Sequence, residues 1–385
     1  MQESARVLIV FCGRFLNEKA DSLFADESAR AFAQLGREVI VLAPRRFGRR
    51  EPKSAPYALV YLPTIDFIRV RLLASFANYL NLAVFSFMVL LWLLFKGHRE
   101  DVVLSNEPIP LLFASLLMRN IVYEVHIIPK KKRWIYRTLL RRTRILLPIT
   151  EWNAKIGEEY GFPKERVLLA RSAVNIELFE ELDKKASRER LGLPEDARIA
   201  LYTGHLYAWK GVDTLAEAAR LRPEIDCMFV GGTTDNIAAF KKKYSAIPNI
   251  RVVGYKPHEE IALWQAAADI LVLPNSDREE ISAHYTSPMK LYEYMASCRP
   301  ILASDLPSIR EIVSEKSAYF ARADDPQSFA NALVKILTDS DEAKSRAAVA
   351  RSIAEGNTWT NRASKILAAL SSAPVFDRSG TTHIM

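Results

Sequence analysis

Residues Ser287 to Ser304 read Ser-Pro-Met-Lys-Leu-Tyr-Glu-Tyr-Met-Ala-Ser-Cys-Arg-Pro-Ile-Leu-Ala-Ser and combine a helix start with a buried strand. Ser287 is suited to cap a helix, and Pro288 suits the first helical position, where a missing N–H costs little. The free backbone N–H groups at such a helix start form a seat for phosphate. Lys290 and Glu293 are three residues apart and share one helix face. The stretch therefore predicts either a nucleotide-binding helix, with diphosphate at its start and ribose at Glu293, or an ordinary surface helix with a solvated Lys–Glu pair.

The composition is that of a folded globular protein. A chain of 385 residues is long enough for two domains, and 49% hydrophobic with 25% charged residues excludes an intrinsically disordered chain. Cys12, Cys227 and Cys298 are far apart and lack metal-ligand spacing, so we expect reduced thiols in the cytoplasm. No cleavable signal peptide is expected, because acidic Glu3 lies near the N-terminus and no long apolar run follows it.

Short β-branched runs alternate with helical stretches, which is the pattern of parallel α/β sheets. The segment Glu177–Arg198 is rich in charge and turn residues and is expected to link two halves. We predict an α/β protein with two doubly wound, Rossmann-like domains facing each other across a cleft, where ligands bind at the carboxyl ends of the strands. The expected strands are Arg6–Phe11, Glu38–Ala43, Ala58–Leu62, Asp101–Ser105, Ile121–Val125, Ile145–Ile149, Ile199–Thr203, Cys227–Val230, Arg251–Gly254, Ile270–Leu273 and Pro300–Ala303.

The segment Leu72–Phe95 carries no charged residue and is long enough to span a bilayer. It lies, however, between the expected strands Ala58–Leu62 and Asp101–Ser105. A true crossing would place these two strands on opposite sides of the membrane, so they could not share a sheet. We favour a helix buried partly in its own domain and partly in the lipid interface. An ordinary core helix, a membrane span and a re-entrant hairpin remain alternatives.

The net charge of +8 is uneven, because residues up to Arg190 carry the whole positive excess. Within this half, Lys130–Arg144 contains eight basic residues and no acidic one, with aromatic and aliphatic residues between them. Such a composition is typical of a helix lying on an anionic membrane surface. A solvated basic face is the alternative, and nucleic acid is the rival partner, although no nucleic-acid-binding module is visible. The residues expected at the membrane are Lys130, Lys131, Lys132, Arg133 and Trp134.

A second candidate binding segment runs from Thr203 to Leu215 and reads Thr-Gly-His-Leu-Tyr-Ala-Trp-Lys-Gly-Val-Asp-Thr-Leu. A strand is expected to end at Thr203, and Gly204 permits a tight turn. Lys210 then stands on a strand-to-helix loop, where its compact positive charge would neutralise a diphosphate. The loop is not a Walker A motif, because the glycine spacing differs. The alternative is a solvated loop lysine.

Together these motifs resemble a known enzyme family. The matching stretches in the second half are Gly204–Gly211, Gly254, Ala268–Pro274 and Lys290–Ala296, in family order and spacing. They are similar to the C-terminal domain of GT-B glycosyltransferases, above all the retaining family 4, which uses nucleotide-activated sugars. In the first half the weaker resemblance rests on Val7–Gly13, Gly36–Pro44 and Tyr123–His126.

The resemblance implies roles for matching residues only. Lys210 would bind the donor diphosphate together with the start of the Ser287 helix, and Glu293 would hold the ribose hydroxyls. His126 would lie near the sugar and the acceptor; without the resemblance a satisfied core imidazole is the preferred interpretation. The catalytic candidates are thus His126, Lys210 and Glu293. The donor-binding candidates are Gly13, Gly204, His205, Lys210, Gly211, Gly232, Gly254, Tyr285, Ser287, Pro288, Met289, Lys290, Leu291 and Glu293.

The chain also departs from the family pattern. A second Glu that usually precedes the helix Glu by eight positions is replaced here by Tyr285, and Glu279 or Glu280 would have to substitute for it. The usual Phe-Gly pair is Ser287-Pro288, and the Arg that often follows the loop glycine is His205. These departures leave the donor sugar and its contacts open.

From the resemblance we expect a peripheral membrane glycosyltransferase on the cytoplasmic face that transfers a sugar from a UDP- or GDP-linked donor to a lipid-linked acceptor, with retention. No metal or other cofactor is expected. The alternatives are a GT-B sugar-nucleotide epimerase or inverting transferase, and an inactive membrane-binding subunit. The expected division is an acceptor- and membrane-associating domain at 1–180, a linker at 181–198, a nucleotide-sugar-binding domain at 199–355, a helix at 356–371 that crosses back to the first domain, and a flexible tail at 372–385.

Overall fold

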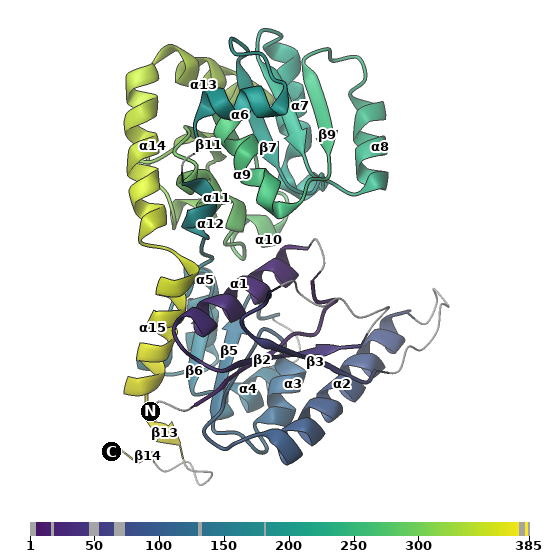
Figure 1. Cartoon of the computed structure of the whole chain (residues 1–385), viewed down its shortest axis with the longest axis vertical. Helices are drawn as coiled ribbons and strands as arrows, with labels where there is room; N and C mark the ends of the chain where they lie inside the picture. Colours follow the sequence, from purple (N-terminus) through teal and green to yellow (C-terminus); the bar gives the residue numbers. More distant parts are fainter. Residues whose placement is uncertain are drawn as a thin grey trace. The chain divides into compact units, whose positions relative to one another are not determined.

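The computed structural model consists of two compact units, which are described separately (Figure 1). Unit 1 comprises Met1–Arg171 and Trp359–Met385, and unit 2 comprises Ser172–Thr358. The residues that the structure describes are 5–16, 19–45, 54–64, 74–129, 133–180, 182–376 and 382–383.

Unit 1 is built on a parallel sheet whose strands lie in the order β3-β2-β1-β4-β5-β6. This is the strand order of doubly wound nucleotide-binding folds, with the topological switch point between β1 and β4. Every strand except β3 is buried along its whole length, which explains the nearly continuous apolar runs in the sequence. The strands are β1 (Val7–Val10), β2 (Val39–Pro44), β3 (Ala58–Leu62), β4 (Val102–Ser105), β5 (Asn120–Val125) and β6 (Ile145–Pro148).

Helices connect these strands, and the last long helix of the chain, α15, packs against α1 within the same unit. The helical elements of unit 1 are α1 (Ala20–Gln34), α2 (Ala74–Lys96), α3 (Pro108–Ala114), α4 (Arg133–Arg142), α5 (Glu151–Glu159), the 3-10 turn η2 (Lys164–Arg166) and α15 (Trp359–Ser372). In the segment expected as a flexible tail, β13 (Val375–Phe376) pairs antiparallel with β14 (Thr382–His383).

Unit 2 repeats the plan of unit 1, with a parallel sheet in the order β12-β11-β10-β7-β8-β9 and a switch point between β7 and β10. Its strands are β7 (Ile199–Thr203), β8 (Asp226–Val230), β9 (Ile250–Gly254), β10 (Ile270–Leu273), β11 (Ile301–Ser304) and β12 (Tyr319–Ala321). Its helical elements are η3 (Ile176–Phe179), α6 (Lys184–Leu191), η4 (Ala208–Lys210), α7 (Val212–Leu221), α8 (Thr234–Lys243), α9 (His258–Ala267), α10 (Glu280–Ala283), α11 (Met289–Ala296), α12 (Pro307–Arg310), α13 (Pro326–Thr338) and α14 (Ser340–Glu355).

Successive residues of β7 enter two different apolar cores, as the alternation of side chains along a strand requires. Ile199 and Leu201 join the cluster that contains α11, whereas Ala200 and Tyr202 join the cluster that contains α7. Each fully buried apolar side chain stabilises the unit by about 1.5–3 kcal/mol. The strand therefore holds its carboxyl end, where the candidate binding loop begins, in a fixed position.

The predicted strands are confirmed to within one residue at each end, but three strands were missed: β12, and the short pair β13 and β14 in the expected tail. β12 is only three residues long and lies at the edge of its sheet, where Tyr319–Ala321 pairs with β11 alone. A run of this length carries no alternation that distinguishes it from a loop.

Residues 182–198 of the expected linker 181–198 are instead folded into unit 2. Asp183 accepts hydrogen bonds from the backbone N–H groups of residues 185 and 186 at the start of α6, and left-handed Gly192 ends the helix. Arg188 is 2% exposed and donates to Asp269 over 2.8 Å. Charge in this segment marks a buried ion pair rather than a solvated connection, and the boundary between the units lies at Arg171/Ser172.

Candidate functional site

The first group of candidate residues gathers in unit 2 at the switch point between β7 and β10. The loop after β7 runs directly against the loop after β10: a Cβ atom added to Gly211 would lie 1.7 Å from the carbonyl oxygen of Pro274. Gly211 also has a φ of +69°, which disfavours any other residue. The glycine lets the loop that carries Lys210 pass this close to its neighbour, and its donor-binding role stays a prediction.

Lys290, on the first turn of α11, lies beside Gly204. A Cβ atom added to Gly204 would be 2.6 Å from the Lys290 Nζ atom, and φ there is +127°. The ammonium group also stands 4.0 Å from the centroid of the Tyr202 ring, a cation–π contact. Less than 1 Å² of Nζ is exposed, and it has no hydrogen-bond acceptor within the described part of the chain. A buried ammonium group without an acceptor is costly, so this position favours an anion.

Lys210 brings a second positive charge to the same place. Its Nζ atom lies 3.7 Å from the centroid of the Trp209 ring, and burial lowers the pKa of Lys210 to about 7. Burial, and then the charge of Lys210, hold the pKa of Lys290 well below its ordinary value against the opposing effect of Glu293. A bound diphosphate would stabilise the charged form of both lysines.

Glu293 lies one helical turn beyond Lys290 and is 9% exposed. Its carboxylate stands 2.9 Å from His258 Nε2 and accepts a 3.2 Å hydrogen bond from Gln265 Nε2. Burial alone would raise the pKa of Glu293, but His258, Gln265 and Lys290 together hold it below its ordinary value. The group is therefore an ionised hydrogen-bond acceptor, as ribose binding requires. His258 and Gln265 were not predicted, because they begin and line α9, far away in sequence.

The start of α11 differs from the prediction. Ser287 does not cap the helix: its hydroxyl accepts a 3.0 Å hydrogen bond from the backbone N–H of Ser172, and the Ser172 hydroxyl donates to the Ser287 carbonyl over 2.5 Å. Pro288 is the N-cap residue and Met289 the first helical residue. The prediction that Pro288 opens the helix is thus one position too early. The first backbone N–H groups of α11 still lack partners within the helix, as at any helix start.

Leu291 is fully buried in the apolar core of unit 2, and its backbone N–H donates to the Pro288 carbonyl over 2.9 Å. Its side chain therefore packs in the core, and its role in donor binding stays a prediction. Tyr285, at the position of the missing Glu, is 8% exposed, whereas Glu279 and Glu280 are exposed.

The remaining donor candidates follow the ends of neighbouring strands. The His205 ring stacks on Tyr207 with centroids 5.1 Å apart. Gly254 accepts a 2.7 Å hydrogen bond at its carbonyl from the N–H of Gly231. A Cβ atom on Gly232 would meet apolar side chains of Leu206 and Ile237 at 3.0–3.3 Å, which indicates packing rather than ligand contact.

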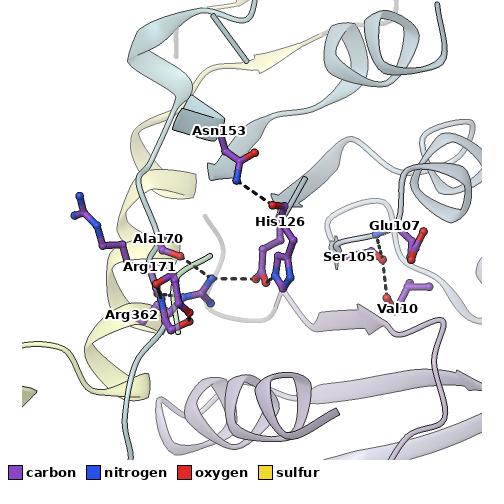
Figure 2. A network of polar contacts seen from close by, with 11 residues as sticks. Val10, Ser105, Glu107, His126, Asn153, Ala170, Arg171 and Arg362 are labelled. Carbon is purple, nitrogen blue, oxygen red and sulfur yellow. Dashed lines mark hydrogen bonds and ion pairs between the residues drawn. The ribbon is translucent and has the colours of Figure 1, made fainter. Parts of the chain in front are cut away.

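Two candidates, His126 and Gly13, belong to unit 1. His126 follows β5, and its Nε2 atom lies 2.7 Å from Glu124. Glu124 in turn forms a 3.0 Å ion pair with Arg362 of α15, and Asn153 donates to the His126 carbonyl over 3.0 Å (Figure 2). Burial would raise the pKa of Glu124, but Arg362 and His126 lower it below its ordinary value. The ionised carboxylate selects the tautomer with the proton on Nε2, and Nδ1 is left as the second polar atom of the ring.

Gly13 follows β1 in the same unit. A Cβ atom there would lie 2.8 Å from Cζ of the Phe11 ring, so the glycine lets this ring pack against the loop.

The membrane candidates lie on or before α4. Lys130, Lys131 and Lys132 are outside the described residues, and Arg133 begins the helix. Trp134 is 70% exposed, and one face of α4 consists of exposed Trp134, Arg137, Thr138 and Arg141. The opposite face is buried through Tyr136, Leu139 and Leu140. The helix is thus amphipathic, with a basic outer face.

α2 packs on α3, which in turn packs on α4. Residues Asn78–Lys96 form a helix that is long and apolar enough to cross a membrane, with a mean hydropathy of 1.8. Only 28% of its most apolar window is buried inside the protein. From residue 78 onward, the exposed large apolar side chains of α2 are Tyr79, Phe87, Leu94 and Phe95. Since β3 and β4, on either side of α2, belong to one sheet, the helix lies against its own unit.

Within the described ranges, no group of three or more His, Cys, Asp or Glu residues is placed to hold a metal ion. No disulfide joins Cys12, Cys227 and Cys298 to one another.

Comparison with known proteins covers both units. Residues 23–178 match the family model "Glycosyltransferase Family 4", and residues 183–353 match "Glycosyl transferases group 1". Among curated relatives, the D-inositol 3-phosphate glycosyltransferase of Thermobispora bispora is 28% identical over 54% of this chain and 51% of its own length. The D-inositol 3-phosphate glycosyltransferase of Stackebrandtia nassauensis is 30% identical over 56% of this chain and 50% of its own length. The chain thus spans about half the length of the curated relatives it matches.

Solved structures share the fold over nearly the whole chain. Sucrose-phosphate synthase of Thermosynechococcus elongatus superimposes with a TM-score of 0.76 at 16% identity, over 94% of this chain and 98% of that one. HepE of Anabaena, in complex with UDP and glucose, superimposes with a TM-score of 0.73 at 16% identity, over 96% of this chain and 100% of that one. At this level of identity the likeness establishes the fold.

Proposed function

Because the chain belongs to the GT-B, family 4-like glycosyltransferases, we propose that it transfers a sugar from a nucleotide-sugar donor to a lipid-linked acceptor at a membrane. The observation that carries the donor half of this proposal is the pair Lys210 and Lys290. Both are shielded, both have lowered pKa values, and Lys290 has no acceptor among the described residues. The diphosphate of a nucleotide sugar supplies the missing negative charge.

Glu293 supports the nucleoside part of the donor. An ionised carboxylate beside His258 accepts hydroxyl hydrogen bonds well, and such charge-assisted bonds are about twice as strong as neutral ones. Lys290 and Glu293 stand one turn apart on α11, so a diphosphate at the lysine brings the adjoining ribose toward the carboxylate.

In the proposed reaction the bond between the anomeric carbon and the diphosphate breaks, and the acceptor oxygen bonds to that carbon. The hydroxyl proton leaves with the departing diphosphate, whose growing negative charge is stabilised by Lys210 and Lys290. Stabilisation of developing charge is usually the largest catalytic contribution. His126, oriented by Glu124, would position the sugar or the acceptor through Nδ1. Retention of configuration rests on the family resemblance, and NMR of the product anomer tests it.

The donor proposal is tested by calorimetry with UDP, the nucleotide bound in several structures of similar fold. Lys210→Ala and Lys290→Ala should each weaken UDP binding at least tenfold while uridine binding changes little. Lys316→Ala, at an exposed lysine of the same unit, is the matched control. If both variants bind UDP as tightly as the unaltered protein, the donor assignment is wrong.

The membrane half of the proposal is supported by α4 and α2. α4 exposes Trp134 and the arginines Arg137, Arg141 and Arg142, while α2 exposes an apolar stripe. Aromatic and basic residues on one face fit the headgroup layer of an anionic leaflet. Three cysteines without a disulfide among them support a location on the reducing, cytoplasmic side.

Vesicle sedimentation tests this proposal. Each basic residue near an anionic surface contributes about 1 kcal/mol, so replacing Arg137, Arg141 and Arg142 by Gln should weaken binding to phosphatidylserine vesicles roughly a hundredfold. The matched control replaces Lys241, Lys242 and Lys243, the exposed lysines that end α8 in unit 2. Equal binding to neutral and anionic vesicles would rule out electrostatic attachment through α4.

A further inference from the structure

A buried ion pair joins Glu124, near the end of β5, to Arg362 of α15 within unit 1. Glu124 is 2% exposed and Arg362 is 7% exposed. The guanidinium group also donates to the backbone carbonyls of Ala170 and Arg171, over 3.2 and 3.0 Å (Figure 2). A buried ion pair is weak evidence for stability, because apolar residues of similar volume often pack equally well. The proposed reaction uses Glu124 only to orient His126 and gives Arg362 no part.

The Glu124 carboxylate is shared between two basic groups. One oxygen lies 3.0 Å from Nη2 of Arg362, and the other lies 2.7 Å from Nε2 of His126. Glu124 and His126 are two residues apart at the end of a strand, so their side chains point to the same side of the sheet. Burial alone would raise the pKa of Glu124, and Arg362 comes first among the groups that lower it. The guanidinium group is therefore the main counter-charge, and the imidazole is needed only as a hydrogen-bond donor.

α15 also holds the His126 ring through aromatic side chains. Phe24 of α1 meets the imidazole edge to face, with ring centroids 5.4 Å apart, and Trp359 meets Phe24 in the same way at 4.8 Å. The guanidinium carbon of Arg362 lies 4.8 Å from the centroid of the Phe24 ring, a cation–π contact. Trp359 and Arg362 are three residues apart and share one face of α15. This face therefore acts on the imidazole both through Glu124 and through Phe24.

We propose that Arg362 is a positioning residue: by neutralising Glu124 it keeps the His126 imidazole uncharged, with Nδ1 available to accept a hydrogen bond. An unprotonated ring nitrogen accepts a hydrogen bond from a hydroxyl group, whereas an imidazolium ion can only donate. The imidazole is thereby suited to a hydroxyl group of the sugar or the acceptor rather than to a phosphate oxygen. This inference rests on the proposed function for the group that Nδ1 contacts.

The role of Arg362 follows from what its loss would do. With the guanidinium removed, His126 would be the cation left beside the buried carboxylate, and it would take up a proton from solvent. Within the described residues, the other charged group that acts on His126 is Glu107, the N-cap residue of α3. Glu107 is present in the unaltered protein and in every variant below, so the comparison isolates the effect of Arg362.

NMR of protein labelled with nitrogen-15 in its histidine rings tests the proposal, because a ring nitrogen without a proton resonates far from one that bears a proton. His126→Gln identifies the His126 signals among the six histidines. At pH 7.0 the unaltered protein should show a proton on Nε2 and none on Nδ1. Arg362→Met should raise the ratio of doubly protonated to neutral His126 roughly tenfold, the lower end of the effect of one nearby charge.

Three further variants make the test specific. Arg362→Lys keeps a positive charge and should largely restore the unprotonated Nδ1. Arg6→Met is the matched control, because Arg6 forms a 2.7 Å ion pair with 2% exposed Asp101 in the same unit, and it should leave His126 unchanged. Glu124→Leu combined with Arg362→Met removes both charges and is expected to fold. In that double variant the neutral ring should populate both tautomers, which provides a second readout that does not depend on the stability of Arg362→Met.

Three results would overturn the proposal: an unchanged charge state of His126 in Arg362→Met, a protonated Nδ1 in the unaltered protein, or an equal change in Arg6→Met. Calorimetry with UDP on the same samples separates this inference from the proposed function. Arg362→Met should bind UDP as the unaltered protein does, because Lys210 and Lys290 belong to unit 2.

The two hypotheses can fail separately. Lys210-dependent UDP binding with a charge state of His126 that ignores Arg362 would refute the role of Arg362 and leave the donor site intact. A charge state that depends on Arg362 in a protein that binds no UDP would refute the proposed function and leave the action of Arg362 on His126.

Discussion

The affinity for UDP should fall steeply as the pH rises above 7, because Lys210 must be protonated to hold the diphosphate. Burial lowers the pKa of this lysine to about 7 in the unliganded protein. A bound diphosphate stabilises the ammonium form and returns its pKa toward the ordinary value of 10.5. Binding is therefore coupled to uptake of a proton, and the affinity decreases with rising pH.

The magnitude follows from the lowered pKa. At pH 7 about half of the unliganded protein carries the charge, and at pH 8.5 only about one molecule in thirty does. UDP should therefore bind roughly fifteenfold more weakly at pH 8.5 than at pH 7.0, a difference of about 1.6 kcal/mol. Lys290, whose pKa is also lowered, would add to this effect if the diphosphate protonates it. The phosphate itself changes little, because its last ionisation has a pKa of about 6.

Isothermal titration calorimetry measures the effect directly. At pH 8.0 the protein should take up about one proton from the buffer on binding. The apparent binding enthalpies in Tris and HEPES should therefore differ by about the difference between the ionisation enthalpies of the two buffers. Lys210→Arg is the matched control, since arginine stays charged throughout this range. That variant should lose the Lys210 share of the pH dependence. A constant affinity from pH 7.0 to 8.5, with equal enthalpies in both buffers, would refute the assignment of Lys210 to the diphosphate.

Three further predictions concern single residues. Glu293→Gln should weaken UDP binding by about 1.5–3 kcal/mol, the usual contribution of a hydrogen bond to a charged group. Binding of 2′,3′-dideoxyuridine diphosphate, which lacks the ribose hydroxyls, should weaken much less. An equal loss of affinity for both ligands in calorimetry would contradict ribose binding. Gly211→Ala should destabilise unit 2 by more than about 2 kcal/mol in urea unfolding, because its Cβ atom would overlap a backbone carbonyl at 1.7 Å. Gly192 has a similar φ but no atom within 4 Å of an added Cβ, so Gly192→Ala should lose only about 1 kcal/mol of stability. Similar losses of stability in the two variants would show that crowding is not the cause. Arg362→Met should destabilise unit 1 by about 3–5 kcal/mol at pH 7, because Glu124 is left buried and charged. Because the folded-state pKa of Glu124 is lowered, its contribution to stability is present above the unfolded pKa of about 4.3 and is lost as the pH falls through the folded value. The difference in unfolding free energy between the variant and the unaltered protein should therefore shrink in acid. A difference that does not depend on pH would refute the ion-pair explanation.

Much of the candidate donor site could be predicted from local sequence. Lys210 follows a strand and precedes a helix, and Lys290 and Glu293 are one turn apart, so chain connectivity already brings each near the carboxyl edge of its sheet. The contacts that set their chemistry were not predictable. His258 and Gln265 reach Glu293 from α9, and Tyr202 meets Lys290 across the sheet. These partners depend on the packing of α9 and β7 against α11, and no local pattern encodes it.

Two errors have the same origin. Ser287 has the identity of a helix cap, yet its hydroxyl is used by Ser172, more than a hundred residues earlier. The charged segment around Arg188 has the composition of a linker, yet Asp269 neutralises it inside unit 2. Propensity describes what a residue does among its neighbours in sequence, and a distant partner can outweigh it.

The sequence by itself determined the two α/β halves, the positions of most strands and the lysines and carboxylate of the proposed donor site. Periodicity and turn chemistry are properties of adjacent residues, so they are visible without a structure. Only the tertiary structure decided which buried charges are paired, which helix faces are exposed, and that α2 forms the wall of a cavity lined by Asn81 and Glu107. Burial and pairing arise from contacts between distant segments, and the pKa values and the unpaired polar atoms of a site follow from them.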